Sequence, residues 1–171
     1  MGKIRPPEPV LLFIGTLYSR PEIFNRASPL LENSYGEILF ISPSVRWDYS
    51  SHYRNELGWP IFRQFIFFRD TIDPGTLADI KLHTISIEEK LSADGKRTIN
   101  LDPGYLCLPR VVLASTKNYS HRIYLGKGIY AEVTLLYQKN TYQPLMFTYR
   151  DYQDTACIDL FLRMRKHLEK K

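Results

Sequence analysis

The sequence predicts an α+β fold, in which amphipathic helices pack on a mixed, mainly antiparallel β-sheet. Two observations support this class. Residues 121–125 and 129–135 alternate apolar and polar side chains, which is the period of β-strands, and they belong to a strand-rich second half of the chain. Helical patterns of apolar residues stand before and after this strand-rich region. One arrangement compatible with this order of elements is ferredoxin-like.

The chain begins with a strand and a helix. Val10–Tyr18 is a continuous apolar run, which predicts a buried strand. Ser19 and Pro21 follow it, and a hydroxyl residue just before an early proline is typical of a helix start. We expect Pro29 to interrupt this helix and Gly36 to end it.

Two more strands and a helix follow in the first half. Residues 37–42 and 61–68 are apolar runs of strand length, and a long polar and aromatic loop joins them at residues 43–58. Asp73 before a proline predicts a helix start, and this helix should end before Asp94. Its buried face is expected to consist of Leu77, Ile80, Thr84, Ile87 and Leu91.

The stretch 97–136 carries most of the unusual polar residues. Asp102-Pro103-Gly104 fits a type II turn, because proline presets φ at its second position and glycine accepts a positive φ at its third. We therefore expect the chain to reverse direction there.

A β-hairpin is predicted around the glycine-rich loop 126–128. In the symmetric register, Arg122 lies opposite Glu132 and Tyr124 lies opposite Tyr130. Side chains of a strand alternate between its two faces, so one face of the hairpin should be apolar and the other polar. The polar face is a candidate site. The predicted core face consists of Ile123, Leu125, Ile129, Ala131, Val133 and Leu135.

The chain is predicted to close with a strand at residues 142–147 and a helix capped by Asp154. A turn at Lys139-Asn140 would join that strand to the hairpin as a meander. The buried stripe of the last helix is expected to be Cys157, Leu160, Phe161, Met164 and Leu168.

Composition limits the class of protein. The 171 residues, 44% of them hydrophobic, suit a single domain over residues 1–171. A formal charge of +5 permits anionic partners, but 18 acidic residues beside 23 basic ones differ from a nucleic-acid-binding tail. Cys107 and Cys157 lack metal-ligand spacing, so we expect reduced thiols and no disulfide-linked partner. Without a signal peptide or a long apolar span, we expect a cytoplasmic protein with no membrane partner.

Two residues of the central stretch are candidates for catalysis. His121 changes charge near neutral pH and so suits a general acid or base, although a lone histidine in a strand is often only hydrogen-bonded. Asp102 is a candidate catalytic or metal-binding carboxylate, although turn formation alone explains an aspartate there. Asp48 is the second candidate metal ligand, and Mg²⁺ is the cation that such carboxylates would hold.

Cations and tyrosines make a candidate ligand site. Lys117, Arg122 and Lys127 lie close together in sequence and would face one anion, or else form a solvated basic rim. Tyr49 and Tyr53 belong to the aromatic loop 47–56, where they would stack on a base or form the loop's own small core. Tyr105 adds a further ring, and Glu132 is explained by an ion pair with Arg122.

Four runs carry a family resemblance: NLDPGYL at 100–106, TKNYSHRIYLGKGIYAEVTL at 116–135, WDYSSHYRNELG at 47–58 and FTYRDY at 147–152. They resemble a prokaryotic family known as a domain of unknown function, number 4416, which is marked by an Asp-Pro-Gly-Tyr motif. The resemblance covers nearly the whole chain. Some members carry a GTP-binding label, yet LGKGIY lacks the Gly-x-x-x-x-Gly frame and the hydroxyl residue of a Walker loop.

Three functions follow as hypotheses. The first is a binder of, or an enzyme acting on, a phosphate-bearing small molecule such as a nucleotide. The second is an RNA-binding module that uses the same cations and tyrosines as a stacking platform. In the third, a structural or interaction protein, these residues only hold the fold.

Overall fold

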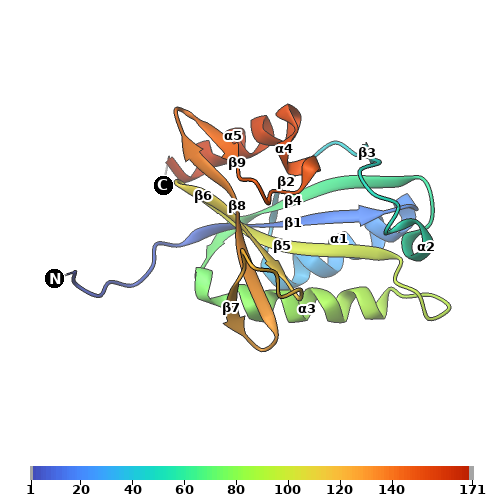
Figure 1. Ribbon diagram of the computed structural model, residues 1–171. Helices are drawn as coiled ribbons and strands as arrows, with labels where there is room; N and C mark the ends of the chain where they lie inside the picture. The colour runs from blue at the N-terminus through green and yellow to red at the C-terminus, as the bar shows by residue number, and fades with distance from the viewer. Residues whose placement is uncertain (1, 170–171) are drawn as a thin grey trace.

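A computed structural model describes residues 2–169 and has the predicted α+β class. Its strands are β1 (Val10–Tyr18), β2 (Ile38–Ile41), β3 (Val45–Trp47), β4 (Ile61–Ile72), β5 (Ile99–Cys107), β6 (Arg110–Ser115), β7 (Ile123–Gly126), β8 (Ile129–Gln138) and β9 (Thr141–Pro144). Its helices are α1 (Pro21–Tyr35), α2 (Arg54–Leu57), α3 (Leu77–Lys90), α4 (Arg150–Gln153) and α5 (Thr155–Glu169), with a 3₁₀ turn, η1, at Pro74–Thr76. Figure 1 shows their arrangement.

All these strands join one sheet in the order β2-β4-β1-β5-β6-β8-β7, with β3 also beside β4 and β9 beside β8. Each pair of neighbours is antiparallel. The strands of β1-α1-β2 are therefore parallel to each other and separated by β4, and those of β4-α3-β5 are separated by β1. Two such split βαβ units give this half of the sheet a ferredoxin-like connectivity. The hairpins of β5 to β9 extend it.

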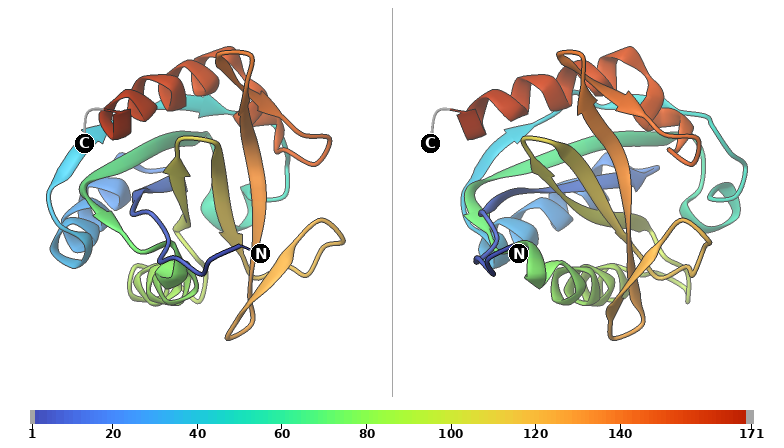
Figure 2. Two further views of the ribbon diagram at one scale, coloured as in Figure 1. Left: turned by 90° about the vertical axis from the view of Figure 1, so that its left-hand side faces the viewer. Right: turned by 60° about the vertical axis from the view of Figure 1, so that its left-hand side comes forward.

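Helices cover both faces of the sheet (Figure 2). α1 and α3 pack on one face, where Phe24, Leu31, Ile80 and Ile87 meet the apolar side chains of β1 and β4. The predicted buried face of α3 is confirmed, because Leu77, Ile80, Thr84, Ile87 and Leu91 are all buried. No helix among the described residues is long and apolar enough to cross a membrane.

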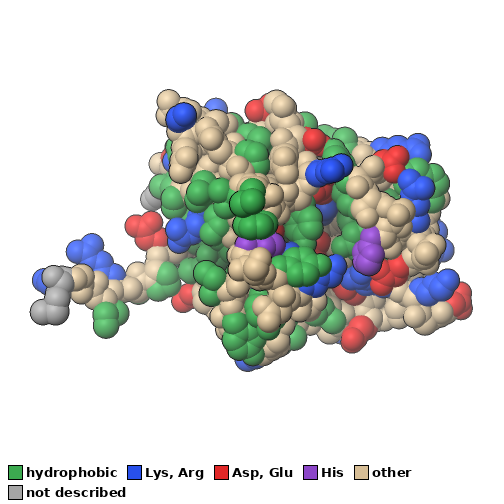
Figure 3. Space-filling model, viewed as in Figure 1, with side chains coloured by type: hydrophobic (Ala, Val, Ile, Leu, Met, Phe, Trp, Pro, Cys, Tyr) green, Lys and Arg blue, Asp and Glu red, His purple; other side chains and the backbone are tan. Residues whose placement is uncertain are grey.

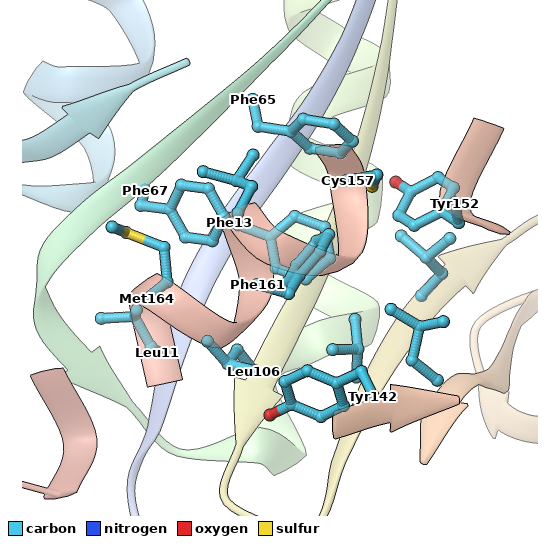
Figure 4. Packing of buried hydrophobic residues seen from close by; sticks show 14 residues of the cluster. Leu11, Phe13, Phe65, Phe67, Leu106, Tyr142, Tyr152, Cys157, Phe161 and Met164 are labelled. Carbon is cyan, nitrogen blue, oxygen red and sulfur yellow. The ribbon is translucent and has the colours of Figure 1, made fainter. Parts of the chain in front are cut away.

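α5 covers part of the opposite face. Its Phe161 projects among Phe13, Phe65 and Phe67 of the sheet (Figure 4), with ring centroids 4.9, 5.6 and 5.6 Å away. Phe161 is fully buried, and the predicted stripe of this helix is confirmed for Cys157, Leu160, Phe161 and Met164, while Leu168 is only partly buried. The thiol of Cys157 is free and lies in the same core.

The prediction that Pro29 interrupts the first helix is wrong, because α1 continues through it to Tyr35. The ring of Pro29 is exposed, while Ala27 and Leu31 on either side of it are buried. Burial of this face outweighs the backbone hydrogen bond that proline removes. Gly36, with φ of 89°, ends the helix as predicted.

The predicted turn at Asp102-Pro103-Gly104 is also wrong, because these residues lie inside β5. The pairing of β5 with β6 begins at Gly104, so Pro103 has no β6 partner whose hydrogen bond it would break. Gly104 is required by close packing and not by a positive φ: a Cβ there would lie 2.4 Å from the Val112 carbonyl oxygen and 2.5 Å from Phe13.

Replacing Gly104 by alanine should therefore lower the free energy of unfolding by about 1–3 kcal/mol, because β6 and a core ring must move apart. Urea denaturation of the purified variant measures the change. Gly2→Ala is the matched control, since no atom lies within 4 Å of a Cβ built at Gly2. Equal stability of Gly104→Ala and the parent protein would contradict the tight approach.

The hairpin of β7 and β8 has the predicted register, with Tyr124 opposite Tyr130. The prediction of its core face is only partly correct. Ile129 and Leu135 are buried, but Ile123, Leu125 and Val133 are exposed. β7 is at the end of the sheet's strand order, and an irregularity between β6 and β8 shifts the alternation near Leu135.

Candidate functional site

A cleft of about 210 Å³ opens on the α5 face of the sheet. It forms because β5 and β6 pair only between Gly104 and Cys107 on the β5 side, so that residues 99–103 have no β6 partner. Further walls come from the start of α4, from the end of β3 at Trp47 and from the loop that contains Tyr53. Basic and acidic side chains gather on this surface between the β7–β8 hairpin and α2 (Figure 3).

Gly15 of β1 makes room at the base of this cleft. It pairs with Phe65 of β4 and with Asp102 of β5, so it lies between the two strands that contribute charged residues. A Cβ built at Gly15 would lie 2.9 Å from Nη1 of Arg63 and 2.9 Å from the hydroxyl of Tyr152. The missing side chain therefore allows both polar groups to lie over the centre of the sheet.

Arg63 is a buried cation held by one carboxylate. Its Nη2 donates to Oδ2 of Asp151 at 2.6 Å, and Nε1 of Trp47 donates to the same oxygen at 3.0 Å. Both side chains of the ion pair are 9% exposed. Burial lowers the pKa of Arg63, but the charges of Asp151, Tyr152 and Asp102 and the hydrogen bond to Asp151 together outweigh it and leave this pKa above its ordinary value.

Several hydrogen-bond donors of the cleft have no acceptor. Nε and Nη1 of Arg63 and the hydroxyl of Tyr152 are buried without a partner among residues 2–169. The hydroxyl of Tyr53 also lacks a described partner, and that of Tyr149 accepts from Arg122 while its own proton stays free. Burial raises the pKa of all three tyrosines, so they are neutral donors near pH 7.

Asp102 lies in the cleft, held by two donors. Lys81 of α3 reaches it from the opposite face of the sheet, with Nζ 3.1 Å from its Oδ1 and 2.8 Å from the carbonyl oxygen of Leu101. Asn100 donates to its other carboxylate oxygen at 2.5 Å. Burial raises the pKa of Asp102, but Lys81 and Arg63 outweigh it and hold this pKa below its ordinary value. Asp102 is therefore ionised near pH 7.

Arg122 organises another wall of the cleft. Its Nε donates to Oε2 of Glu132 at 2.7 Å, which confirms the predicted cross-strand pair. Its Nη1 donates to the hydroxyl of Ser115 and the carbonyl oxygen of Lys117, and its Nη2 donates to Tyr149. Because protein acceptors already engage Nε and both terminal nitrogens, Arg122 positions its neighbours more than it offers free donors.

The predicted ligand residues separate into two groups. Lys117, Tyr53 and Arg122 line the cleft, and the ammonium group of Lys117 has no described partner. Lys127 and Tyr105 do not line it. Lys127 forms an exposed ion pair with Asp79 at the tip of the hairpin, and Tyr105 packs with the apolar cluster around Leu77 and Ile129.

Of the predicted catalytic and metal-binding residues, some line the cleft and others lie outside it. Asp102 lines the cleft, whereas His121 does not. The ring of His121 stacks on that of Phe147 with centroids 4.3 Å apart, and its Nε2 lies 3.0 Å from Oε2 of Glu132. Asp48, the other predicted metal ligand, forms an exposed ion pair with Arg54 and is not among the residues that line the cleft. Among the described residues, no three His, Cys, Asp or Glu side chains group as metal ligands.

Tyr49 lines a second cavity of about 460 Å³ and not the cleft. Its hydroxyl donates to the carboxylate of Asp154. This second cavity lies between β3 and the first turns of α5. Trp47, Arg63 and Asp151 line both spaces, so these hydrogen-bonded residues form the wall between them.

The cleft residues that were not predicted as site residues from the sequence include Arg63, Lys81 and Tyr152. One signal for Arg63 was available: it stands at an inward position of a strand, in alternation with Ile61 and Phe65, where an apolar residue is expected. No comparable pattern marked Lys81, because its position in the sequence assigns it to the charged, solvent-facing side of α3.

One protein-family model matches residues 8–168, which is nearly the whole chain, and its description is domain of unknown function DUF4416. Neither the curated proteins nor the solved structures include a match. The geometry of the cleft is therefore the basis for a functional argument.

Proposed function

The chain belongs to the DUF4416 family, whose description names no activity, and we propose that it binds a phosphate-bearing small molecule in the cleft. The observation that carries this proposal is the surplus of hydrogen-bond donors. Arg63 and Tyr152 have buried N–H and O–H groups without an acceptor. Tyr53, Tyr149 and Lys117 add less buried donors without a described acceptor. A buried donor without an acceptor costs free energy, which an oxyanion in the cleft would recover.

The charges of the cleft also favour an anion. Its lining includes five cationic side chains, which are Arg63, Lys81, Arg97, Lys117 and Arg122. It includes three carboxylates, which are those of Asp102, Glu132 and Asp151, and each of them is ion-paired to a cation. Arg97 is also paired, with Glu56 and Glu88 outside the lining. Lys117 is therefore the one cation of the lining without a described carboxylate partner, and its positive charge is available to a ligand.

The size of the cleft limits the ligand. Pockets for drug-sized ligands usually have volumes of about 300–1,000 Å³, and this cleft, at about 210 Å³, is smaller. It suits a phosphate group together with a compact carrier, such as a sugar or part of a nucleotide. Long polymers would need an open groove, so the dimensions favour a small molecule over RNA.

RNA is the second candidate. Three exposed rings are those of Tyr119 just before β7, Tyr124 on β7 and Phe147 between β9 and α4. Such rings can stack on bases of a single strand. The buried, unpartnered donors of Arg63 and Tyr152 are the observation against this candidate, because a single strand stacked on these exposed rings would not reach them.

Nucleoside monophosphates and sugar phosphates, tested with and without magnesium, should raise the melting temperature of the protein. A ligand at one hundred times its dissociation constant stabilises the fold by about 2.7 kcal/mol. Salt-dependent binding of single-stranded RNA, measured in parallel, tests the second candidate. If no phosphate compound shifts the melting temperature, the proposal fails.

Tyr152→Phe and Lys117→Ala separate binding from folding in the same assay. Tyr152→Phe removes a buried hydroxyl that has no partner, so the free energy of unfolding should not fall. Lys117→Ala removes an exposed ammonium group at the cleft, and Lys127→Ala is its matched control on the hairpin. The first two variants should lose the stabilisation by phosphate compounds, and the control should keep it.

A further inference from the structure

The second cavity differs from the cleft in its chemistry. Pro43, Val45, Trp47, Phe65 and Leu160 give it mainly apolar walls. At about 460 Å³, it lies within the usual volume range of small-molecule sites. A cavity of this kind gains free energy when apolar surface of a ligand is buried in it.

The charged groups that line the second cavity balance one another. Three of them are arginines, at positions 46, 63 and 163, and three are aspartates, at positions 151, 154 and 159. Arg46 lies over the ring of Trp59 at 4.7 Å, and Arg163 lies over the ring of Phe40 at 4.3 Å. Asp154 accepts from Tyr49. Unlike the cleft, this space therefore offers no excess of either charge to an ionic ligand.

Aromatic surface is prominent in its walls. The rings of Trp47 and Tyr49 are 5.8 Å apart and tilted by 56°, and Phe65 is the third ring of the lining. Aromatic rings attract one another beyond the effect of burying their area. The carboxylate of Asp159, which has no described partner, is exposed and can accept a hydrogen bond from the ligand.

We propose that the second cavity binds a neutral aromatic molecule that carries a hydroxyl or other hydrogen-bond donor. The ring lies against Trp47 and Phe65, and the donor faces the carboxylate of Asp159. This site is separate from the cleft, and the proposal does not depend on which anion the cleft takes.

The wall between the two spaces gives the second site a direct reporter. Nε1 of Trp47 donates to Asp151, whose same oxygen accepts from Arg63. A ring that packs against Trp47 changes the environment of this N–H group. Its signal in a ¹H–¹⁵N NMR spectrum therefore reports occupation of the second cavity, and Trp59→Phe assigns it, because the chain has two tryptophans.

The test titrates benzyl alcohol and its saturated counterpart, cyclohexylmethanol, without any phosphate compound present. Benzyl alcohol should shift the Trp47 signal until it saturates, and cyclohexylmethanol should bind at least about tenfold more weakly, a difference of about 1.4 kcal/mol. Equal shifts with both alcohols would overturn the aromatic class. No saturable shift with either would overturn the site.

Two variants locate the binding. Ala156 lines the second cavity at the start of α5, and Ala156→Phe should fill the space and abolish the shift. Thr155→Phe is the matched control, because Thr155 is exposed on the same turn and does not line the cavity. A shift that survives in Ala156→Phe, or that is lost equally in both folded variants, would place benzyl alcohol elsewhere and overturn the proposal.

Discussion

Replacing Asp151 by alanine should lower the free energy of unfolding by about 3–5 kcal/mol, because it leaves a buried guanidinium group without its counter-charge. Asp151 is the one carboxylate within ion-pair distance of Arg63 among residues 2–169. Asp102 lies nearby but is paired with Lys81. Trp47 also loses the acceptor of its ring N–H group. Guanidinium denaturation followed by circular dichroism measures the loss.

Two comparisons make this prediction specific. Asp159→Ala removes an exposed carboxylate of α5 that has no described partner, so its effect should stay within about 0.5 kcal/mol. The double variant Arg63→Met, Asp151→Ala removes both charges and should be more stable than Asp151→Ala alone. A double variant that is less stable than the single one would show that Arg63 does not depend on Asp151 for its counter-charge.

Elements with a regular apolar period could be predicted from the sequence. The spacing of Ile80 and Ile87 gives the buried face of α3, and that of Leu160 and Met164 gives the face of α5. The register of the β7–β8 hairpin followed from the symmetry of its loop. In these segments, local pattern and tertiary packing favour the same structure, so short-range rules are sufficient.

Predictions failed where packing overrides a local preference. Asp102-Pro103-Gly104 has the composition of a turn, but the burial of its neighbours Leu101 and Leu106 and the ladder to β1 keep it extended. The chain instead reverses at Leu108 and Pro109, between β5 and β6. Glycine at 104 is explained by its close approach to Val112 on β6 and to Phe13 on β1, a strand far away in the sequence. One sequence without its fold does not reveal such a contact.

The residues of the candidate site show the same contrast between local pattern and long-range packing. Lys117, Arg122 and Asp102 could be predicted, because they lie near one another in the chain and polar residues are conspicuous there. Arg63 and Asp151 could not be paired in advance, since 88 positions separate them. Antiparallel pairing of β4 with β1, and the placement of α4 over that sheet, bring the two together. The donors that carry the proposed function are therefore a product of long-range topology.

Phe161→Ala should destabilise the protein by about 3–5 kcal/mol, which is the usual cost of removing a fully buried phenylalanine ring. Phe161 is the ring of α5 that packs among Phe13, Phe65 and Phe67, and its centroid lies 6.0 Å from that of Tyr152. Deletion leaves a cavity that rigid strands on one side cannot fill. Urea denaturation of the variant gives the free energy.

Phe147→Ala is the control for this last change, because its ring is 48% exposed and packs mainly on His121. We expect Phe147→Ala to lower the free energy of unfolding by less than half as much as Phe161→Ala. The comparison also tests how the site is held, since α5 follows directly from α4, which carries Asp151 and Tyr152. Loosening α5 should weaken binding of phosphate compounds in the cleft as well as lower stability. If Phe161→Ala and Phe147→Ala cost the same, the aromatic cluster does not anchor α5, and the wall between the two cavities must be held in another way.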